Sequence, residues 1–325
     1  GVGLDRLKQW IGRNMKALIC GSIAYDTIMV FQDYFKNHIL PDKVHILNVS
    51  FLVPSLRREF GGCAGNIAFS LKMLGADPAP MATVGKDFDS YAKWMDKNAI
   101  NRSQIKIIPD SYTAQAFITT DMDDNQITAF HPGAMNAAHE NPIKDAADVE
   151  IGIVSPDGRQ GMIDHALQFQ QAGIPFIFDP GQGMPMFNGQ ELLQLIEIAD
   201  WVAVNDYECQ LMQERTALSP KQIAERVRAL IVTRGSSGSL IYTNQKIIEI
   251  GCVQSPEVND PTGCGDAYRA GILYGLLKEM DWETTGRIAA LLGAIKVARH
   301  GTQNHRFSAA EFRDKFKQTF AYNMN

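Results

Sequence analysis

Short apolar runs alternate with amphipathic segments along most of the chain. The apolar runs are rich in β-branched side chains and have the length of strands that are buried on both faces. They lie at residues 17–20, 81–84, 150–154, 175–178, 201–204 and 230–233. Strands separated by helices favour right-handed crossovers and a mostly parallel sheet with helices on both sides. The predicted fold class is therefore α/β.

Three of the amphipathic segments also carry helix boundary signals. In residues 66–74 the apolar side chains share one helical face, and Gly75 suits a left-handed C-cap. Residues 219–230 begin with serine and proline, a typical N-cap and first turn, and continue with apolar residues at helical spacing. Ser308 and Glu311 have the spacing of a capping box. These signals predict a helix at each of these places.

Two segments interrupt the alternation. Residues 27–60 show no helical period and are rich in aromatic residues, and residues 114–130 read as two strands around a turn at 121–125. The turn is rich in aspartate, but it lacks the glycine and the terminal glutamate of a calcium-binding loop. We expect a small accessory β-sheet, with segments at about 27–58 and 113–131, that closes over the carboxyl edge of the main sheet, where ligands bind in open α/β folds.

Composition and charge narrow the class of protein. The 325 residues are 45% hydrophobic and 21% charged, as is typical of a folded globular protein. With 31 basic and 36 acidic side chains, the net charge of −5 gives no reason to expect nucleic acid or an anionic membrane as a partner. No apolar run reaches the roughly 18 residues of a membrane-spanning helix.

The cysteines and the first residues bear on the cellular compartment. The five cysteines are scattered and never form a CxxC pair, so neither a disulfide framework nor a zinc site is expected, and a reducing cytoplasm fits best. Residues 1–14 lack the apolar segment of a signal peptide. We expect them to be a cloning remnant or a disordered start, and assign residues 15–325 to one domain.

The most informative segment joins a small-residue loop to an apolar helix at residues 260–271. Its glycines let the backbone turn N–H groups inward, and the helix N-terminus adds its positive dipole end, so an anion is expected there. Asp266 lies at the same place, although its carboxylate would repel a bound anion, so its presence there indicates a chemical role. That role is accepting a proton from a hydroxyl that attacks a bound phosphoryl group. An ordinary helix start explains the segment about equally well by itself.

A second glycine cluster, residues 61–66, also leads into a helix and ends at Asn66. A tight turn is the simplest explanation of the glycines alone. Asp26, just after the first strand, favours a binding site instead. Its carboxylate and the amide of Asn66 together suit the two hydroxyls of a diol.

Two further polar segments follow strands. Asn205 and Glu208 share a helix face and suit water-mediated contacts to a metal and to phosphates, although a solvated helix start is the more common reason for such a pair. Residues 233–238 either wrap the phosphates of a nucleotide or form a simple hairpin turn.

Two common nucleotide-binding motifs are missing from the sequence. Gly85 and Lys86 lack the earlier glycine of a Walker A loop, and Gly263 and Gly265 are followed by Tyr268 instead of the third glycine of a dinucleotide-binding fingerprint. A P-loop ATPase and a nicotinamide dehydrogenase are therefore disfavoured.

Taken in order, these motifs resemble those of the ribokinase-like (PfkB) carbohydrate and nucleoside kinases, over about residues 16–320. Within that family the similarity is greatest to bacterial adenosine kinases. It rests on residues 21–26, 50–53, 62–66, 130–135 and 265–271. The resemblance implies a three-layer sandwich with a small β-sheet lid. Cys264 departs from the pattern, because the family's loop usually has alanine, glycine or valine there.

The resemblance implies roles for the catalytic loop. Asp266 is the general base for the substrate's primary hydroxyl. Backbone N–H groups stabilise the charge on the transferred phosphoryl group, and they belong to Gly263, Cys264, Gly265 and Asp266.

It also implies a nucleoside site. Asp26, Asn66 and Gly62 bind the ribose hydroxyls, with Ser22 and Ser50 as further hydrogen-bond partners. The aromatic side chains of Phe130 and Phe117 cover a purine base, for which a flat ring needs no particular hydrogen-bond pattern.

On the donor side the resemblance implies ATP with Mg²⁺. Asn205 and Glu208 support the magnesium ion, Glu208 through water, and the ATP phosphates. The nucleotide-binding residues are Asn205, Glu208, Thr233, Gly235, Gly238 and Gly265. Asp260 and the turn at Gly301 match positions that hold a monovalent cation such as K⁺ in relatives.

Three functions are compatible with these residues. The first is ATP-dependent phosphorylation of the 5′-hydroxyl of adenosine. The second is the same reaction on another nucleoside or on a free sugar such as fructose or ribose. Ribokinases tend to carry a sugar-binding glutamate in the strand that ends here at residues 154–156, and its absence disfavours ribose. The third, a catalytically silent binding protein, is disfavoured by the presence of Asp266. An exposed small sheet also makes a homodimer plausible.

Overall fold

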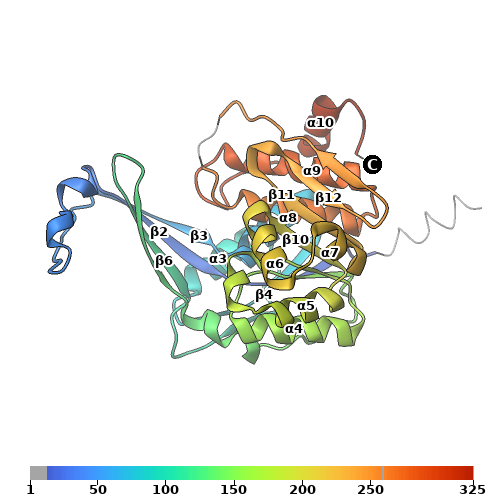
Figure 1. Ribbon diagram of the computed structural model, residues 1–325, viewed down its shortest axis with the longest axis horizontal. Coiled ribbons are helices and arrows are strands. Elements are labelled where there is room, and N and C mark those ends of the chain that lie inside the picture. The colour runs from blue at the N-terminus through green and yellow to red at the C-terminus, as the bar shows by residue number, and fades with distance from the viewer. Residues whose placement is uncertain (1–12, 258–259, 325) are drawn as a thin grey trace, which may run out of the picture.

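The computed structural model describes residues 13–257 and 260–324 (Figure 1). Most of the expected N-terminal remnant, residues 1–12, lies outside the described residues. Its last two residues contact the domain: Arg13 pairs with Glu279 at 3.2 Å, and the Asn14 side chain donates to the Asp148 carbonyl at 2.9 Å.

A nine-stranded sheet forms the centre of the molecule, with neighbouring strands parallel except at the β12 and β13 end. From one edge to the other its strands are β13 (Ile247–Ile250), β12 (Ser239–Tyr242), β11 (Ala229–Thr233), β10 (Trp201–Asn205), β9 (Phe176–Phe178), β8 (Ile151–Val154), β1 (Lys16–Cys20), β4 (Asp77–Val84) and β5 (Ile105–Ile107). Each apolar run of the sequence lies within one of these strands or begins one residue before it, so the predicted mostly parallel sheet is confirmed.

Helices cover both faces of the sheet because its strands are apolar on both sides. In β1, Ala17 and Ile19 belong to one hydrophobic core, and Leu18 and Cys20 belong to the other. The first core is completed by α2 (Cys63–Leu74), α3 (Asp89–Lys97), α8 (Cys264–Leu277), α9 (Trp282–Val297) and α10 (Ala309–Phe320). The second is completed by α4 (Arg159–Ala172), α5 (Gly189–Ile198), α6 (Asp206–Thr216) and α7 (Pro220–Arg226). This confirms the three-layer α/β sandwich.

The helix boundary signals are confirmed, with one error at a C-terminus. Gly75 is the left-handed C-cap of α2 with φ 102°, and Ser308 forms the capping box of α10 with Glu311. Leu230 was placed both in the helical pattern that begins at Ser219 and in the strand of residues 230–233, and the helix ends at Arg226. The strand assignment is the correct one, because Leu230 pairs with Tyr242 inside β11.

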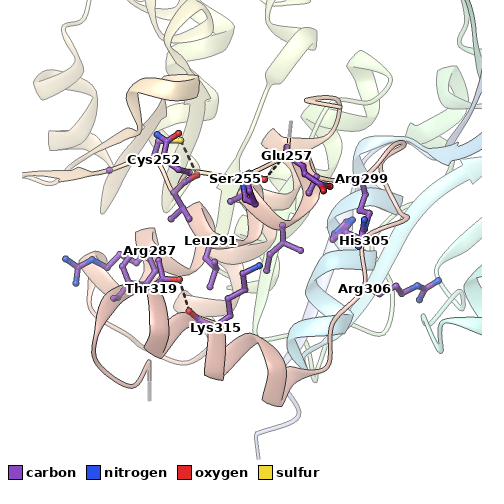
Figure 2. Close-up of a pocket in the computed structure, with 18 residues that line it drawn as sticks. Cys252, Ser255, Glu257, Arg287, Leu291, Arg299, His305, Arg306, Lys315 and Thr319 are labelled. Atoms are coloured by element: carbon purple, nitrogen blue, oxygen red, sulfur yellow. Dashed lines mark hydrogen bonds between the residues drawn. The ribbon is translucent and has the colours of Figure 1, made fainter. Parts of the chain in front are cut away.

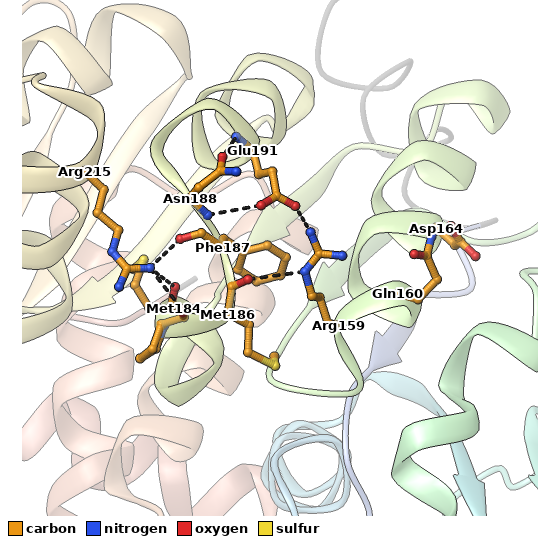
Figure 3. A network of polar contacts seen from close by, with 10 residues as sticks. Arg159, Gln160, Asp164, Met184, Met186, Phe187, Asn188, Glu191 and Arg215 are labelled. Atoms are coloured by element: carbon orange, nitrogen blue, oxygen red, sulfur yellow. Dashed lines mark hydrogen bonds and ion pairs between the residues drawn. The ribbon is translucent and has the colours of Figure 1, made fainter.

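Polar contacts hold the turn before α5 against its neighbours (Figure 3). Asn188 caps α5 in a capping box with Glu191, and Glu191 also pairs with Arg159 of α4. Arg215 of α6 donates to the carbonyl of Phe187 in the same turn. These contacts tie α4, α5 and α6 together.

The second sheet has four strands and projects from the body of the molecule (Figure 1). Its order is β3 (Ser55–Gly61), β2 (Ala24–Val30), β6 (Ala114–Thr120) and β7 (Gln126–His131), and this confirms the predicted small sheet. The turn between β6 and β7 is held by Asp121, whose carboxylate accepts the N–H groups of Asp123 and Asn125. No helix among residues 13–257 and 260–324 is long and apolar enough to cross a bilayer.

Candidate functional site

The loop before α8 needs glycine at its last position. Gly263 is the N-cap of α8 with φ 80°, and a Cβ there would lie 2.7 Å from Cγ2 of Thr302. Gly265 and Asp266 follow in the first helical turn, where N–H groups have no partner within the helix. The N–H of Cys264 behaves differently, because it donates to the Pro261 carbonyl at 3.1 Å. Cys264 was expected to offer this N–H to an anion, and the structure corrects that expectation.

Asp266 is joined to Asn66, as the sequence motifs suggested. The Asn66 amide of α2 donates to the Asp266 carboxylate at 2.9 Å across 200 residues of sequence. Burial raises the pKa of Asp266, while the hydrogen bond from Asn66 and the charge of Arg269 act in the opposite direction. Asp266 is therefore a carboxylate that is partly withdrawn from water at the positive end of a helix.

Asp26 contributes a second carboxylate to the same cleft. It lies on β2 and pairs in register with Glu59 of β3. Burial, together with the negative charges of Glu59, Asp260 and Asp266, raises the pKa of Asp26 to about 6. A cleft with this much negative charge favours ligands that donate hydrogen bonds, such as the hydroxyls of a sugar.

The strand register separates the two aromatic residues expected to cover the substrate. Asp26 lies opposite Ala116, and Ala116 lies opposite Phe130, so Asp26 and Phe130 share one face of the small sheet. Phe117 follows Ala116 directly and therefore points to the other face. Strand spacing puts Phe130 roughly 10 Å from Asp26, two strands away. The structure thus separates Phe117 from the face that carries Asp26.

Ser22 and Gly62 form the turn into α2. The Ser22 hydroxyl accepts the N–H of Cys63 at 3.0 Å, and Gly62 has φ 89°. A Cβ on Gly62 would lie 2.5 Å from the Ser22 carbonyl oxygen, so only glycine permits this approach. Ser50, the other expected serine, is exposed in the segment between residues 43 and 55.

A polar cleft of about 420 Å³ lies between Asp266 and α6. Asn205 and Glu208 line it, and they also form the capping box of α6, with the Glu208 N–H donating to the Asn205 side chain at 2.7 Å. The spacing of these two residues therefore has a structural reason as well as a place in the cleft.

An apolar cavity of about 460 Å³ continues from this cleft. It is lined by the turn of residues 235–238, by residues 251–255 and by one side of α8 and α9. Thr233, Gly235, Gly238 and Gly265 all line it, and Thr233 and Gly265 line the polar cleft too. The apolar cavity therefore opens into the polar cleft that contains Asp266.

A larger cavity of about 660 Å³ lies on the other side of residues 251–257, between α9 and α10 (Figure 2). Two of its arginines lie over aromatic rings: the Arg287 guanidinium over Phe320, which also lines the cavity, and that of Arg306 over Phe69. None of the residues expected at the site lines this cavity.

Comparison with known proteins now decides the family. Residues 26–308 match the pfkB family of carbohydrate kinases. The chain belongs to this family. It is 36% identical over 261 residues to a nucleoside kinase of Methanocaldococcus jannaschii, covering 79% of this chain and 85% of that protein.

Solved structures of a nucleoside kinase from Burkholderia thailandensis are similar over nearly the whole chain. The inosine complex is 50% identical with a TM-score of 0.86, and covers 94% of this chain and 99% of that one. The complex with ADP and inosine is 52% identical with a TM-score of 0.83, covering 94% and 97%. The family and the ribokinase-like fold expected from the sequence are confirmed.

Three features of this pfkB site were not visible in the sequence. Arg269 of α8 and Asp179, at the end of β9, form a buried ion pair of 3.3 Å that lines the polar cleft. Burial raises the pKa of Asp179 to about 7, against the charge of Arg269. Its position just after a strand was a usable signal for Asp179, and Arg269 lies in the segment 265–271 that carries the family resemblance, but neither residue was given a role.

The third feature is Gln303, which orients Asn66. Its amide nitrogen donates to the Asn66 side-chain oxygen at 3.1 Å and to the Tyr91 hydroxyl at 2.8 Å, and its oxygen accepts from Trp94. With its oxygen occupied in this way, Asn66 presents its nitrogen to Asp266. No sequence pattern marks Gln303.

The residues fit the two implied cations differently. Described residues contain no cluster of three or more histidine, cysteine, aspartate or glutamate side chains for a metal. Mg²⁺ suits Glu208 nevertheless, since it usually binds one or two carboxylates, waters and the substrate's phosphates. A monovalent cation at Asp260 does not fit, because the Lys296 ammonium already donates to the Asp260 carbonyl at 2.7 Å.

Proposed function

We propose that this protein is an ATP-dependent nucleoside kinase that phosphorylates the 5′-hydroxyl of purine nucleosides, including adenosine. The observation that carries the proposal is the placement of Asp266 in the first turn of α8, hydrogen-bonded to Asn66 and close enough to Asp26 to raise its pKa. This arrangement sets a proton acceptor between a site for hydroxyls and a site for phosphate.

Asp266 acts as the general base. A carboxylate is far too weak a base to remove the proton of an alcohol beforehand, so the proton moves to Asp266 as the oxygen forms its bond to the γ-phosphorus of ATP. The bond from that phosphorus to the bridging oxygen breaks, and ADP leaves. The N–H groups of Gly265 and Asp266, at the positive end of α8, stabilise the charge on the transferred group.

The small sheet supplies the nucleoside site. Asp26 and Asn66 bind the ribose hydroxyls, and the Phe130 ring, on the same face as Asp26, covers the base. The roughly 10 Å between them suits a ribose with its attached purine. Closure of this sheet over the nucleoside excludes water and limits hydrolysis of ATP.

ATP occupies the apolar cavity, with its phosphates in the polar cleft. The shared residues Thr233 and Gly265 mark the passage between the two. Glu208 would hold Mg²⁺ through water, and the ion would supply positive charge to the phosphates. The buried Arg269 guanidinium, paired with Asp179, adds a positive charge on the same side. The absence of CxxC pairs fits a cytoplasmic enzyme.

A nucleoside is a better supported acceptor than a free sugar. The relatives with 36% and 50% identity are nucleoside kinases, and one was solved with inosine. The test is ADP release with adenosine, inosine, guanosine, cytidine, ribose and fructose at equal concentration. We expect the purine nucleosides to give the highest kcat/KM. Faster turnover of ribose or fructose than of every nucleoside contradicts the proposal.

A further inference from the structure

A lysine side chain is fully buried behind the catalytic loop. Lys296, in the last turn of α9, has 0% of its surface exposed. Its ammonium donates to the carbonyl oxygen of Asp260 at 2.7 Å and to that of Arg299 at 3.1 Å. A buried ammonium is costly unless such acceptors replace its water. Lys296 is therefore a dehydrated cation held by main-chain oxygens.

The two carbonyls belong to two loops that are joined at this point. The Asp260 carboxylate accepts the N–H of Gly301 at 2.8 Å, and the N–H of Asp260 donates to the carbonyl of Val297, the last residue of α9, at 3.1 Å. Lys296 adds a second link between the loops, through the carbonyls of Asp260 and Arg299. A cation that draws carbonyls of both loops to one point fixes their separation.

The first of these loops runs directly into the start of α8. The Asp260 carboxylate also accepts the N–H of Thr262 at 2.9 Å, and the Pro261 carbonyl accepts that of Cys264. The second loop reaches Gly263 through Thr302, whose methyl group leaves no room for a Cβ there. The position of Lys296 is thus transmitted to Gly265 and Asp266 through backbone contacts.

We propose that the Lys296 ammonium is a built-in cation, which takes the place of a bound monovalent ion and positions the phosphate-binding turn at the start of α8. This proposal rests on the proposed kinase function. Lys296 is a positioning residue, since it touches the loop carbonyls and no group that reacts. The enzyme therefore needs no K⁺.

Two measurements on the unmodified enzyme and its variants test this. For the wild type, kcat with adenosine or inosine should be the same in K⁺, Na⁺ and choline chloride at equal ionic strength. Lys296→Met removes the charge but keeps the length of the side chain. It should lower kcat on the order of 10²-fold in choline, the effect of a small displacement at a reacting centre. K⁺ or NH₄⁺ should restore most of the loss.

The thermal midpoint provides a readout that does not depend on activity. K⁺ should raise the midpoint of Lys296→Met relative to choline and leave that of the wild type unchanged. Lys317→Met, on the exposed side of α10, is the matched control and should show no cation dependence in either measurement. Lys296→Gln is a second variant if the first fails to fold.

Three results would overturn the proposal. They are strong stimulation of the wild-type kcat by K⁺, full activity of a folded Lys296→Met in choline, and a loss of kcat in this variant that no cation restores. Aggregation of both variants in every salt also counts against it, because a bound ion should replace the charge. Failure of the wild type to phosphorylate any nucleoside would refute the kinase function, while a K⁺-dependent midpoint of the variant would still support the built-in cation.

Discussion

At the scale of single residues, the site depends on the orientation of side-chain amides. Gln303 is held by Trp94 and donates to the Asn66 oxygen, so the Asn66 nitrogen must face Asp266. The Asp266 carboxylate is thereby held in one position at the start of α8. A general base needs such positioning more than it needs a particular pKa.

Replacing Asp266 by asparagine tests its role as the base. Asp266→Asn keeps the size of the side chain and removes the proton acceptor, so we expect nucleoside binding to persist while kcat falls by about 10²–10⁴-fold. Steady-state kinetics and calorimetric binding measure the two effects. Asp314→Asn, on exposed α10, is the matched control. A kcat within threefold of the wild type would exclude Asp266 as the base.

The pKa of Asp26 predicts a pH dependence of nucleoside binding. Because this pKa is raised to about 6, the carboxyl becomes protonated as the pH falls below that value and accepts hydrogen bonds from ribose less well. We expect the KM for the nucleoside to rise as the pH is lowered through about 6. Asp26→Asn should bind nucleosides more weakly and lose this step, and a variant that retains it would assign the titration to another group.

At the scale of elements, strand register decides which side chains reach the substrate. Phe117 and Phe130 are 40% and 51% exposed, and both lie on the small sheet. Only the pairing of β2, β6 and β7 distinguishes them, by placing Phe130 on the face that carries Asp26. A shift of one residue in register would exchange their roles.

The two phenylalanines form a matched pair of variants. Phe130→Ala should weaken nucleoside binding by about 1–3 kcal/mol, the range for an aromatic ring stacked on a base. Phe117→Ala should leave the affinity unchanged, since its ring lies on the opposite face. Titration calorimetry with inosine measures both. Equal losses in the two variants would show that the rings act through folding of the sheet and not through the base.

At the scale of the whole molecule, the opposite face of the small sheet is apolar and open. Met29 pairs with Leu56 and with Thr119, and Thr119 pairs with Ile127, so Leu56 and Ile127 lie on the same face as Phe117. Leu56 is 63% exposed and Ile127 is 44% exposed. Exposed apolar side chains on one face of a projecting sheet are typical of an interface.

A homodimer through this face is therefore our prediction for the state in solution. Sedimentation equilibrium should give the mass of two chains for the wild type. Leu56→Ser combined with Ile127→Ser should shift it to one chain, because polar side chains oppose burial of the patch. Leu167→Ser, on α4 and about as exposed as Ile127, should not. A wild type that is monomeric at every concentration would exclude this interface.

Much of the fold was determined by the sequence alone. The strands of the main sheet, the turn at Asp121 and the glycine-rich start of α8 depend on periodicity and on residues close in sequence, so they could be read directly. The pairing of Asp26, Asn66 and Asp266 was also expected, because polar residues at strand and helix ends meet at one edge of the sheet.

Only the tertiary structure decided the contacts between distant segments. Gln303 meets Asn66 across 237 residues, and the side chain of Lys296 meets the Asp260 carbonyl across 36. The face of Phe117, the pair of Arg269 with Asp179 and the engaged N–H of Cys264 likewise follow from packing and register. Local patterns carry no information on such contacts, since each partner is chosen by the three-dimensional fold and not by its neighbours in sequence.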